Sequence, residues 1–135
     1  GFKALSDDEV RAKHAAAKDS TALKKHRVED LLFVNEKLRD YQELWDQLEY
    51  MVHIDAEDLQ YVYDWRLEAE KKLRAQKGEE NAMSDEKVKT FVDGYFPAYE
   101  LYTEGLRSEM WRNEVGRKLR FVVDKQRKVK KVETI

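Results

Sequence analysis

Arg66 is the residue of this sequence best suited to hold a charged ligand. At about 100° per residue, it falls within the same stripe of a predicted helix as Leu59, Val62 and Leu73. A guanidinium on an apolar stripe must be paired or face a cleft, and its planar fork of donors suits phosphate. The alternative is an ion pair with Glu70, four residues on, which the helical spacing allows. The residue types alone favour this ion pair.

His53 and Asp55 stand where a strand is expected to end. Residues 50–54 form a short, nearly continuous apolar run stopped by charge, which is typical of a strand buried on both faces between parallel neighbours. Ligands of open α/β sheets bind beyond the carboxyl ends of such strands. His53 and Asp55 are therefore candidates for substrate contacts, and this position strengthens the ligand hypothesis for Arg66.

The helix that carries Arg66 is predicted to begin at Asp55 and to reach Arg74. Asp55 is the N-cap candidate, and the carboxylates of Glu57 and Asp58 in the first turn complement the helix dipole. A short strand passing directly into a long helix, with an amphipathic helix before it, favours an α/β layer over a helical bundle.

Asn35 is the polar member of an earlier amphipathic stretch. From residue 28 to about residue 48, apolar side chains recur at helical spacing, which predicts a core-facing helix with a possible interruption. Asn35 shares a stripe with Leu31, Leu38 and Trp45. A buried amide on such a stripe is more often a satisfied core residue than a ligand contact, and both roles stay open.

Three further segments complete the predicted elements. Ser6 and Glu9 form a capping box that begins a helix. Ser84 begins another, which Gly94 and Pro97 are expected to break or kink before a second short helix. The tail from residue 118 alternates with period two around the turn DKQRK, which predicts a β-hairpin. Its clustered basic residues, Arg127 among them, suit a solvated edge strand.

Composition narrows the classes of function. The chain has 135 residues, a formal net charge of -2 and no cysteine. This composition gives no basic footprint for nucleic acid and favours a reducing, cytoplasmic setting. No apolar run is long enough to cross a membrane. The sequence contains no GxxxxGK[ST], GxGxxG, HExxH, EF-hand or GxSxG motif, so no complete active site and no metal site can be identified.

Long motifs in the sequence resemble one family of kinases. They are N-x-x-L-x-x-Y, formed by Asn35, Leu38 and Tyr41, then VYDWRLEAE around Arg66, then MSDEKVKTFVDGYFPAYELY and the basic β tail. Together they resemble the C-terminal half of the D-glycerate 3-kinase-like P-loop kinases, over nearly all of the chain from Asn35 onward. This resemblance implies an α/β fold, the C-terminal part of a three-layer P-loop kinase sandwich. It would be mainly helical, with a buried central strand and a C-terminal β-hairpin.

The resemblance also implies an activity, which is transfer of the γ-phosphate of ATP, with Mg²⁺, to a hydroxyl of glycerate or a similar small metabolite. Residues 1–135 would then be the part of the kinase domain that lacks the Walker A half. The chain alone is expected to be inactive, with the missing half as a possible partner. Arg66 is the first candidate for a phosphate or acidic-substrate contact, followed by Asp55 and His53, then Asn35, with Arg127 as a cofactor contact.

Two alternatives to the glycerate-kinase hypothesis remain. One is a docking module without catalysis, whose surfaces would be the apolar face of residues 28–48 and the aromatic residues from Tyr95 to Tyr102. The other is a fragment of a uridine- or pantothenate-type kinase, because these enzymes share the general architecture.

Overall fold

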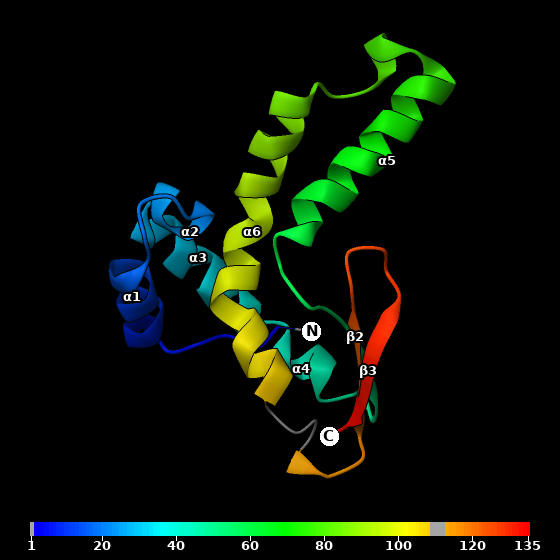
Figure 1. Cartoon of the computed structure of the whole chain (residues 1–135). Coiled ribbons are helices and arrows are strands. Elements are labelled where there is room, and N and C mark those ends of the chain that lie inside the picture. Colours follow the sequence, from blue (N-terminus) through cyan, green and yellow to red (C-terminus); the bar gives the residue numbers. More distant parts are fainter. Residues whose placement is uncertain (1, 109–112) are drawn as a thin grey trace.

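The computed structural model describes residues 2–108 and 113–135. Its longest element is a helix with the first three helices on one side and the long helix α5 and the sheet on the other (Figure 1). In chain order the helices and strands are α1 (Asp7–Ala16), α2 (Ala22–Lys25), α3 (Val28–Arg39), α4 (Gln42–Trp45), β1 (Met51–Ala56), α5 (Tyr61–Lys77), the 3₁₀ turn η1 (Glu79–Asn81), α6 (Asp85–Ser108), β2 (Lys118–Val123) and β3 (Val129–Thr134). Among the described residues, no helix combines the length and the apolar composition needed to cross a lipid bilayer.

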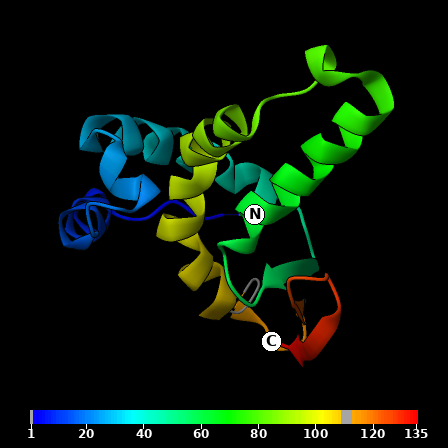
Figure 2. The same cartoon turned by 45° about the horizontal axis from the view of Figure 1, so that its top comes forward.

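Helix α6 holds the core together by packing on two sides. Toward its C-terminal half, Leu101 and Tyr102 join a buried cluster with Val10 of α1 and Leu31 of α3. Toward its N-terminal half, buried residues such as Val92 contact α2 and partly buried side chains of α5. Figure 2 shows the α1–α3 group on the opposite side of α6 from α5. Apolar residues around so much of α6 are expected of a helix covered on several faces.

The predicted break in α6 at Gly94 and Pro97 is wrong, because the helix continues through Pro97. Proline lacks the N–H that would bond to the carbonyl four residues earlier, which here belongs to Asp93. The Asp93 carbonyl instead accepts a hydrogen bond from His26 Nε2 at 2.9 Å. The His26 side chain, just after α2, thus replaces the missing backbone donor, and α6 continues through Pro97.

The first helices follow the sequence signals closely. Ser6 caps α1, its Oγ accepts the Glu9 N–H, and the Glu9 carboxylate accepts the Ser6 N–H, so the predicted capping box is confirmed. The predicted stretch over residues 28–48 is present as two helices, α3 and α4, so its possible interruption is real.

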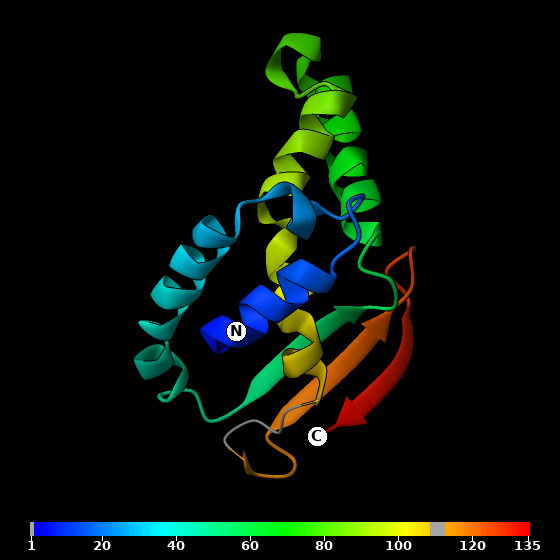
Figure 3. The ribbon, with the colours of Figure 1, turned by 90° about the vertical axis from the view of Figure 1, so that its left-hand side faces the viewer.

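A mixed three-stranded sheet packs beside α6, in the order β1-β2-β3 (Figure 3). Strand β1 runs parallel to β2, and β2 runs antiparallel to β3, which confirms the predicted hairpin. Asp124 shapes its turn by accepting the N–H groups of Gln126 and Lys128, both at 2.9 Å. The buried Lys118 donates from Nζ to the Leu106 carbonyl at 2.9 Å, so it caps the end of α6 and joins that end to β2.

Strand β1 is confirmed, but it lies at the sheet edge, and the prediction that both its faces are buried is wrong. His53 and Asp55 point to the side covered by α6 and are buried. Val52 and Ile54 point to the other side and are 63% and 72% exposed. Successive side chains of a strand alternate between faces, and the described residues supply a cover for only one of them.

The helix after β1 begins later than the sequence suggests, at Tyr61 rather than near Asp55. Asp55 belongs to the strand, and its carboxylate is held by two arginines, so it is unavailable as an N-cap. Asp58 performs a related task, because its Oδ1 accepts the Gln60 N–H at 2.9 Å and turns the chain into α5.

Candidate functional site

A cavity of about 520 Å³ lies between the carboxyl end of β1, the first half of α5 and the middle of α6. Its walls are mainly apolar and aromatic, with Trp65 from α5 and Tyr95 and Tyr99 from α6. The polar residues His53, Asp55, Arg66 and Thr103 also line it. An apolar pocket with a few polar groups, placed beyond a strand end, has the form of a small-molecule site.

Three residues that line this cavity each have a buried side-chain atom without a hydrogen-bond partner. The atoms are His53 Nδ1, Arg66 Nε and Thr103 Oγ1, and the described residues contain only one other such side-chain atom, Trp45 Nε1. Buried polar groups in folded proteins are nearly always paired with protein, water or ligand. The gathering of three unpaired atoms in one cavity therefore indicates a place for a polar ligand.

Arg66 forms the ion pair that the sequence allows, and it also lines the cavity. Its guanidinium forms an ion pair with Glu70, whose carboxylate is buried and also accepts the Met83 N–H at 3.1 Å. The same guanidinium lies 5.2 Å from the centroid of the Phe91 ring. The predicted ion pair thus exists, and it holds Arg66 in the cavity wall while its Nε is buried without a hydrogen-bond partner.

His53 brings a neutral imidazole to the cavity. Burial lowers its pKa, Asp55 partly opposes this shift, and the positive charges of Arg120, Lys118 and Arg107 reinforce it. Its Nε2 is 4.0 Å from Asp55 Oδ1, too far for a hydrogen bond. His53 is therefore uncharged near neutral pH and can exchange a hydrogen bond with a ligand through Nδ1.

The carboxylate of Asp55 is surrounded by two arginine side chains, Arg107 and Arg120. Arg107 donates to both of its oxygens, at 2.8 and 2.9 Å, and Arg120 donates to Oδ2 at 2.9 Å from Nε. Arg107 also donates to the Ala56 carbonyl, and Arg120 pairs with Glu133 of β3. Burial alone would raise the pKa of Asp55, but the hydrogen bonds from both arginines outweigh it and lower the pKa. This carboxylate joins β1, β2 and α6, and both of its oxygens accept hydrogen bonds from arginines.

Asn35 lies outside the cavity and is fully buried, at 0% exposure. Its Oδ1 accepts the Leu5 N–H at 2.9 Å and the Tyr102 hydroxyl at 3.2 Å, and its Nδ2 donates to the Leu5 carbonyl at 2.8 Å. All these bonds link the N-terminal segment, α3 and α6. The arrangement supports the core-amide role over the ligand role.

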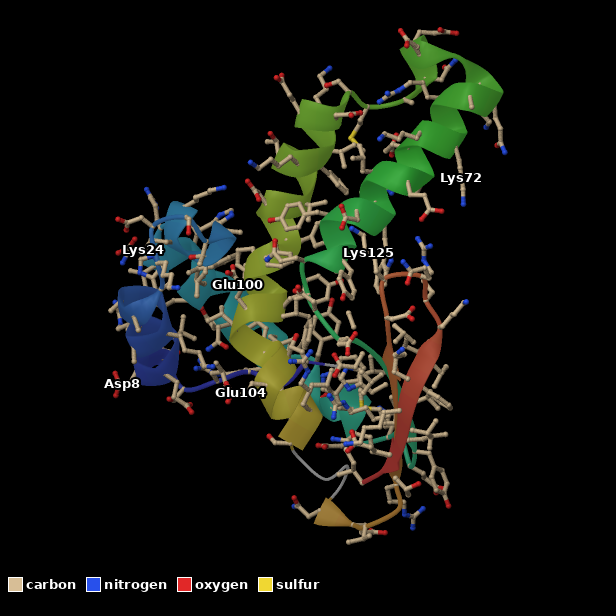
Figure 4. The ribbon with its side chains drawn as sticks, in the orientation of Figure 1. Asp8, Lys24, Lys72, Glu100, Glu104 and Lys125 are labelled. Carbon is tan, nitrogen blue, oxygen red and sulfur yellow. The ribbon has the colours of Figure 1, made fainter. Side chains whose placement is uncertain are left out.

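Arg127 reaches the site only through a neighbour. It lies in the hairpin turn with a φ of 62°, pairs with Glu68 at 2.9 Å, and has its guanidinium 5.2 Å from the Trp65 ring centroid. Trp65 in turn donates from Nε1 to the Lys125 carbonyl at 2.7 Å, and Figure 4 shows Lys125 beside the start of α5. Arg127 therefore supports the outer wall of the cavity.

Comparison with known proteins shows which kinases this chain is similar to. No protein-family model matches the sequence. The chain is 38% identical over 110 residues to the chloroplastic D-glycerate 3-kinase of Arabidopsis thaliana, which covers 81% of this chain and 21% of that protein. It is 41% identical over 85 residues to the uncharacterized kinase mug58 of Schizosaccharomyces pombe, covering 62% of this chain and 29% of that kinase. The structure of D-glycerate 3-kinase from Cryptococcus neoformans var. grubii matches with a TM-score of 0.91 and 36% identity, over 100% of this chain and 47% of the other.

The chain is a homologue of the D-glycerate 3-kinases and related kinases. The resemblance expected from the sequence motifs is thus confirmed. The α/β fold class is confirmed as well, and it matches the C-terminal part of a glycerate kinase. This glycerate-kinase homologue spans less than half the length of each of the three relatives.

Three residues at or near the cavity were not predicted from the sequence. Thr103 lines the cavity, and Arg107 and Arg120 hold Asp55. Thr103 could have been found, because it follows Tyr95 and Tyr99 at intervals of four and is the polar member of their stripe on α6. The two arginines carried no local signal. Their partner Asp55 is 52 and 65 residues away in the chain.

A second, larger cavity of about 640 Å³ lies between α2, α5 and α6 of this chain. It contains none of the candidate residues, and several of its charged groups are paired with protein. Asp93 accepts from Tyr63 at 2.6 Å and from Lys25 at 2.9 Å, and Asp85 pairs with Arg74. The smaller cavity, with its unpaired atoms, is the better candidate for a ligand site.

Proposed function

We propose that this chain is the C-terminal part of an ATP-dependent small-molecule kinase domain, and that it supplies part of the substrate site for a hydroxy acid such as glycerate. The observation that carries the proposal is the cavity with three unpaired polar atoms, found in a homologue of D-glycerate 3-kinases. Its polar groups suit a small ligand with one anionic group and at least one hydroxyl.

In the proposed reaction, a substrate hydroxyl oxygen attacks the γ-phosphorus of ATP. A new P–O bond forms, the bond to the β-phosphate oxygen breaks, ADP leaves, and the hydroxyl proton is released. Catalysis of such transfers comes mostly from positioning and from stabilising charge on the phosphoryl oxygens. Mg²⁺ would neutralise charge on the phosphates when bound.

Arg66 is the residue proposed to meet the anionic group, either the substrate carboxylate or the transferring phosphate. The ion pair with Glu70 orients its guanidinium, and Nε is buried without a partner on a residue that lines the cavity. An arginine held in this way is oriented before a ligand arrives, so it contributes positioning and charge together. His53 supplies an uncharged hydrogen-bonding group beside it.

The nucleotide-binding elements are proposed to come from a P-loop half, because the 135 residues contain no GxxxxGK[ST] motif. The exposed apolar face of the sheet is a natural surface for that half. It presents Val52, Ile54 and Val132, which are 63%, 72% and 53% exposed. Of the docking surfaces expected from the sequence, residues 28–48 do expose Phe33, at 60%. The aromatic residues 95–102 instead point largely into the protein.

The test is reconstitution of activity. The chain is mixed with the part of the Cryptococcus D-glycerate 3-kinase that it does not cover, and phosphorylation of D-glycerate by Mg-ATP is measured. We expect turnover only in the mixture. If both parts are folded and associate but no hydroxy acid or nucleoside is phosphorylated, the chain is a docking module and the kinase proposal is wrong. Preference for uridine or pantothenate would place it in another kinase class.

Arg66→Lys then tests the role of the arginine. Lysine keeps a positive charge near Glu70 but loses the planar fork, so we expect kcat/KM to fall by about 100-fold or more, with little change in thermal stability. The exposed Arg11 on α1 provides the matched control, and Arg11→Lys should leave both quantities unchanged. A variant that chiefly unfolds, with normal turnover of its folded fraction, would reduce Arg66 to a structural ion pair.

A further inference from the structure

Thr103 is an unusual residue near the C-terminal end of α6, because its hydroxyl is buried and unpaired. The residue is 4% exposed and Oγ1 has no hydrogen-bond partner. Threonine hydroxyls inside helices commonly bond to a carbonyl one turn earlier, as Thr90 of the same helix does to Glu86 at 3.1 Å. Thr103 forgoes this bond and lines the cavity.

His53 brings a second unpaired atom to the same cavity from β1. It is 8% exposed, and Nδ1 is buried without a partner. The positive charges around its ring and its own burial keep the imidazole neutral. Both His53 and Thr103 therefore offer uncharged groups that can donate or accept a hydrogen bond, which is the chemistry that recognises a hydroxyl and gives little attraction to a second anionic group.

We propose that His53 Nδ1 and Thr103 Oγ1 form a hydroxyl-recognition subsite that makes the cavity select hydroxylated acids over their deoxy analogues. The inference rests on the proposed function, in which Arg66 holds the anionic end of the same ligand. The subsite adds specificity, because a ligand that lacks the hydroxyl leaves both buried groups unpaired.

Removing a side-chain group that serves only to bind a ligand should not lower the stability of the free chain, whereas removing a structural group should. Thr103→Val has the same shape and removes the unpaired hydroxyl, so the variant chain should have an unchanged or higher Tm. Thr90→Val, on the same helix, is the matched control at an exposed position. A clear fall in Tm for Thr103→Val would show that the hydroxyl has a structural partner in solution, and this result would overturn the subsite.

Ligand titrations provide the decisive test. D-glycerate, lactate and 3-hydroxypropionate are titrated into the chain by calorimetry, and the ring nitrogens of the three histidines are followed by NMR. The wild-type chain should prefer glycerate to at least one deoxy analogue by about tenfold or more, and glycerate should shift the His53 Nδ1 signal. Thr103→Val should reduce the preference to within about twofold, and Thr103→Ser should restore it.

The outcomes separate the two proposals. If the wild-type chain binds none of the three acids, the assignment of the cavity as the substrate site is wrong, and the subsite is wrong with it. If glycerate binds and shifts His53, but Thr103→Val keeps the full preference, only the role of Thr103 in the subsite is overturned. Arg66→Lys should weaken all three acids by a similar factor, because each has the carboxylate.

Discussion

Replacing Asp55 by Asn should destabilise the chain strongly without removing a ligand contact. The Asp55 side chain is 1% exposed and lies between Arg107 and Arg120, whose side chains are 33% and 18% exposed. These contacts join β1 to α6 and to β2. Asparagine has nearly the same shape but no charge, and its amide nitrogen would face a guanidinium. The substitution therefore isolates the charge from the packing.

The expected loss can be estimated from these contacts. Removing one partner of a buried ion pair costs about 3–5 kcal/mol, because the remaining charge is left without compensation. Both arginines here are partly exposed and can recover some hydration, and the asparagine oxygen keeps one hydrogen bond. We therefore expect a loss near the lower limit, about 3 kcal/mol. For a chain of this length such a loss lowers Tm by about 10 °C.

The pH dependence of stability provides an independent check of the same charge. The pKa of Asp55 in the folded chain is lowered from its ordinary value of 3.8. Its stabilising effect is therefore complete above that value and is lost as the pH falls through the lower folded pKa. The difference in unfolding free energy between wild type and Asp55→Asn should be constant from pH 6 to 8 and should shrink in acid below about pH 4.

Urea unfolding followed by circular dichroism measures this difference at each pH. Asp19→Asn is the matched control, because Asp19 is exposed in the turn after α1, and it should change the midpoint little. A loss below about 0.5 kcal/mol for Asp55→Asn, equal to that of a surface substitution, would refute the reasoning. So would normal stability accompanied by a large loss of glycerate affinity, since Asp55 would then be a ligand contact.

Two further predictions concern residues that hold α6 in place. His26→Ala removes the donor to the Asp93 carbonyl, and it should lower the free energy of unfolding in urea by about 1–2 kcal/mol. His26→Gln keeps a donor and should recover part of this loss. An unchanged urea midpoint in His26→Ala would show that Pro97 needs no substitute donor. Asn35→Ala removes three hydrogen bonds at a fully buried position, and it should lower the free energy of unfolding by about 3 kcal/mol. The glycerate affinity of the folded chain should stay unchanged. Lost affinity at normal stability would show that Asn35 is a ligand contact.

Elements with local signals were predictable from the sequence. The capping box of Ser6 and Glu9 and the hairpin around Asp124 involve residues only a few positions apart, and both are as expected. The break at Pro97 was not predictable from local rules, because its remedy comes from His26, far away in the chain. Local propensity was overruled by a tertiary hydrogen bond.

The candidate site shows the same division. Arg66 and His53 were found because each is a polar or basic residue in an apolar pattern, and the fold brings both to one cavity. Asp55 was found at the strand end, but its surroundings could not be read from its neighbours in sequence. The arginines that neutralise it come from the end of α6 and from β2, so only the fold reveals that this carboxylate is structural.

The exposed side of β1 connects the sequence pattern to the proposed architecture. A strand with one solvated face normally alternates apolar and polar residues, whereas a continuous apolar run is typical of a strand covered on both sides. Val52 and Ile54 continue the run, yet they are 63% and 72% exposed. The sequence of β1 is therefore suited to a second covering layer that the described residues do not supply. The agreement of the whole chain with 47% of a glycerate kinase structure makes the proposed P-loop half the most economical source of that layer.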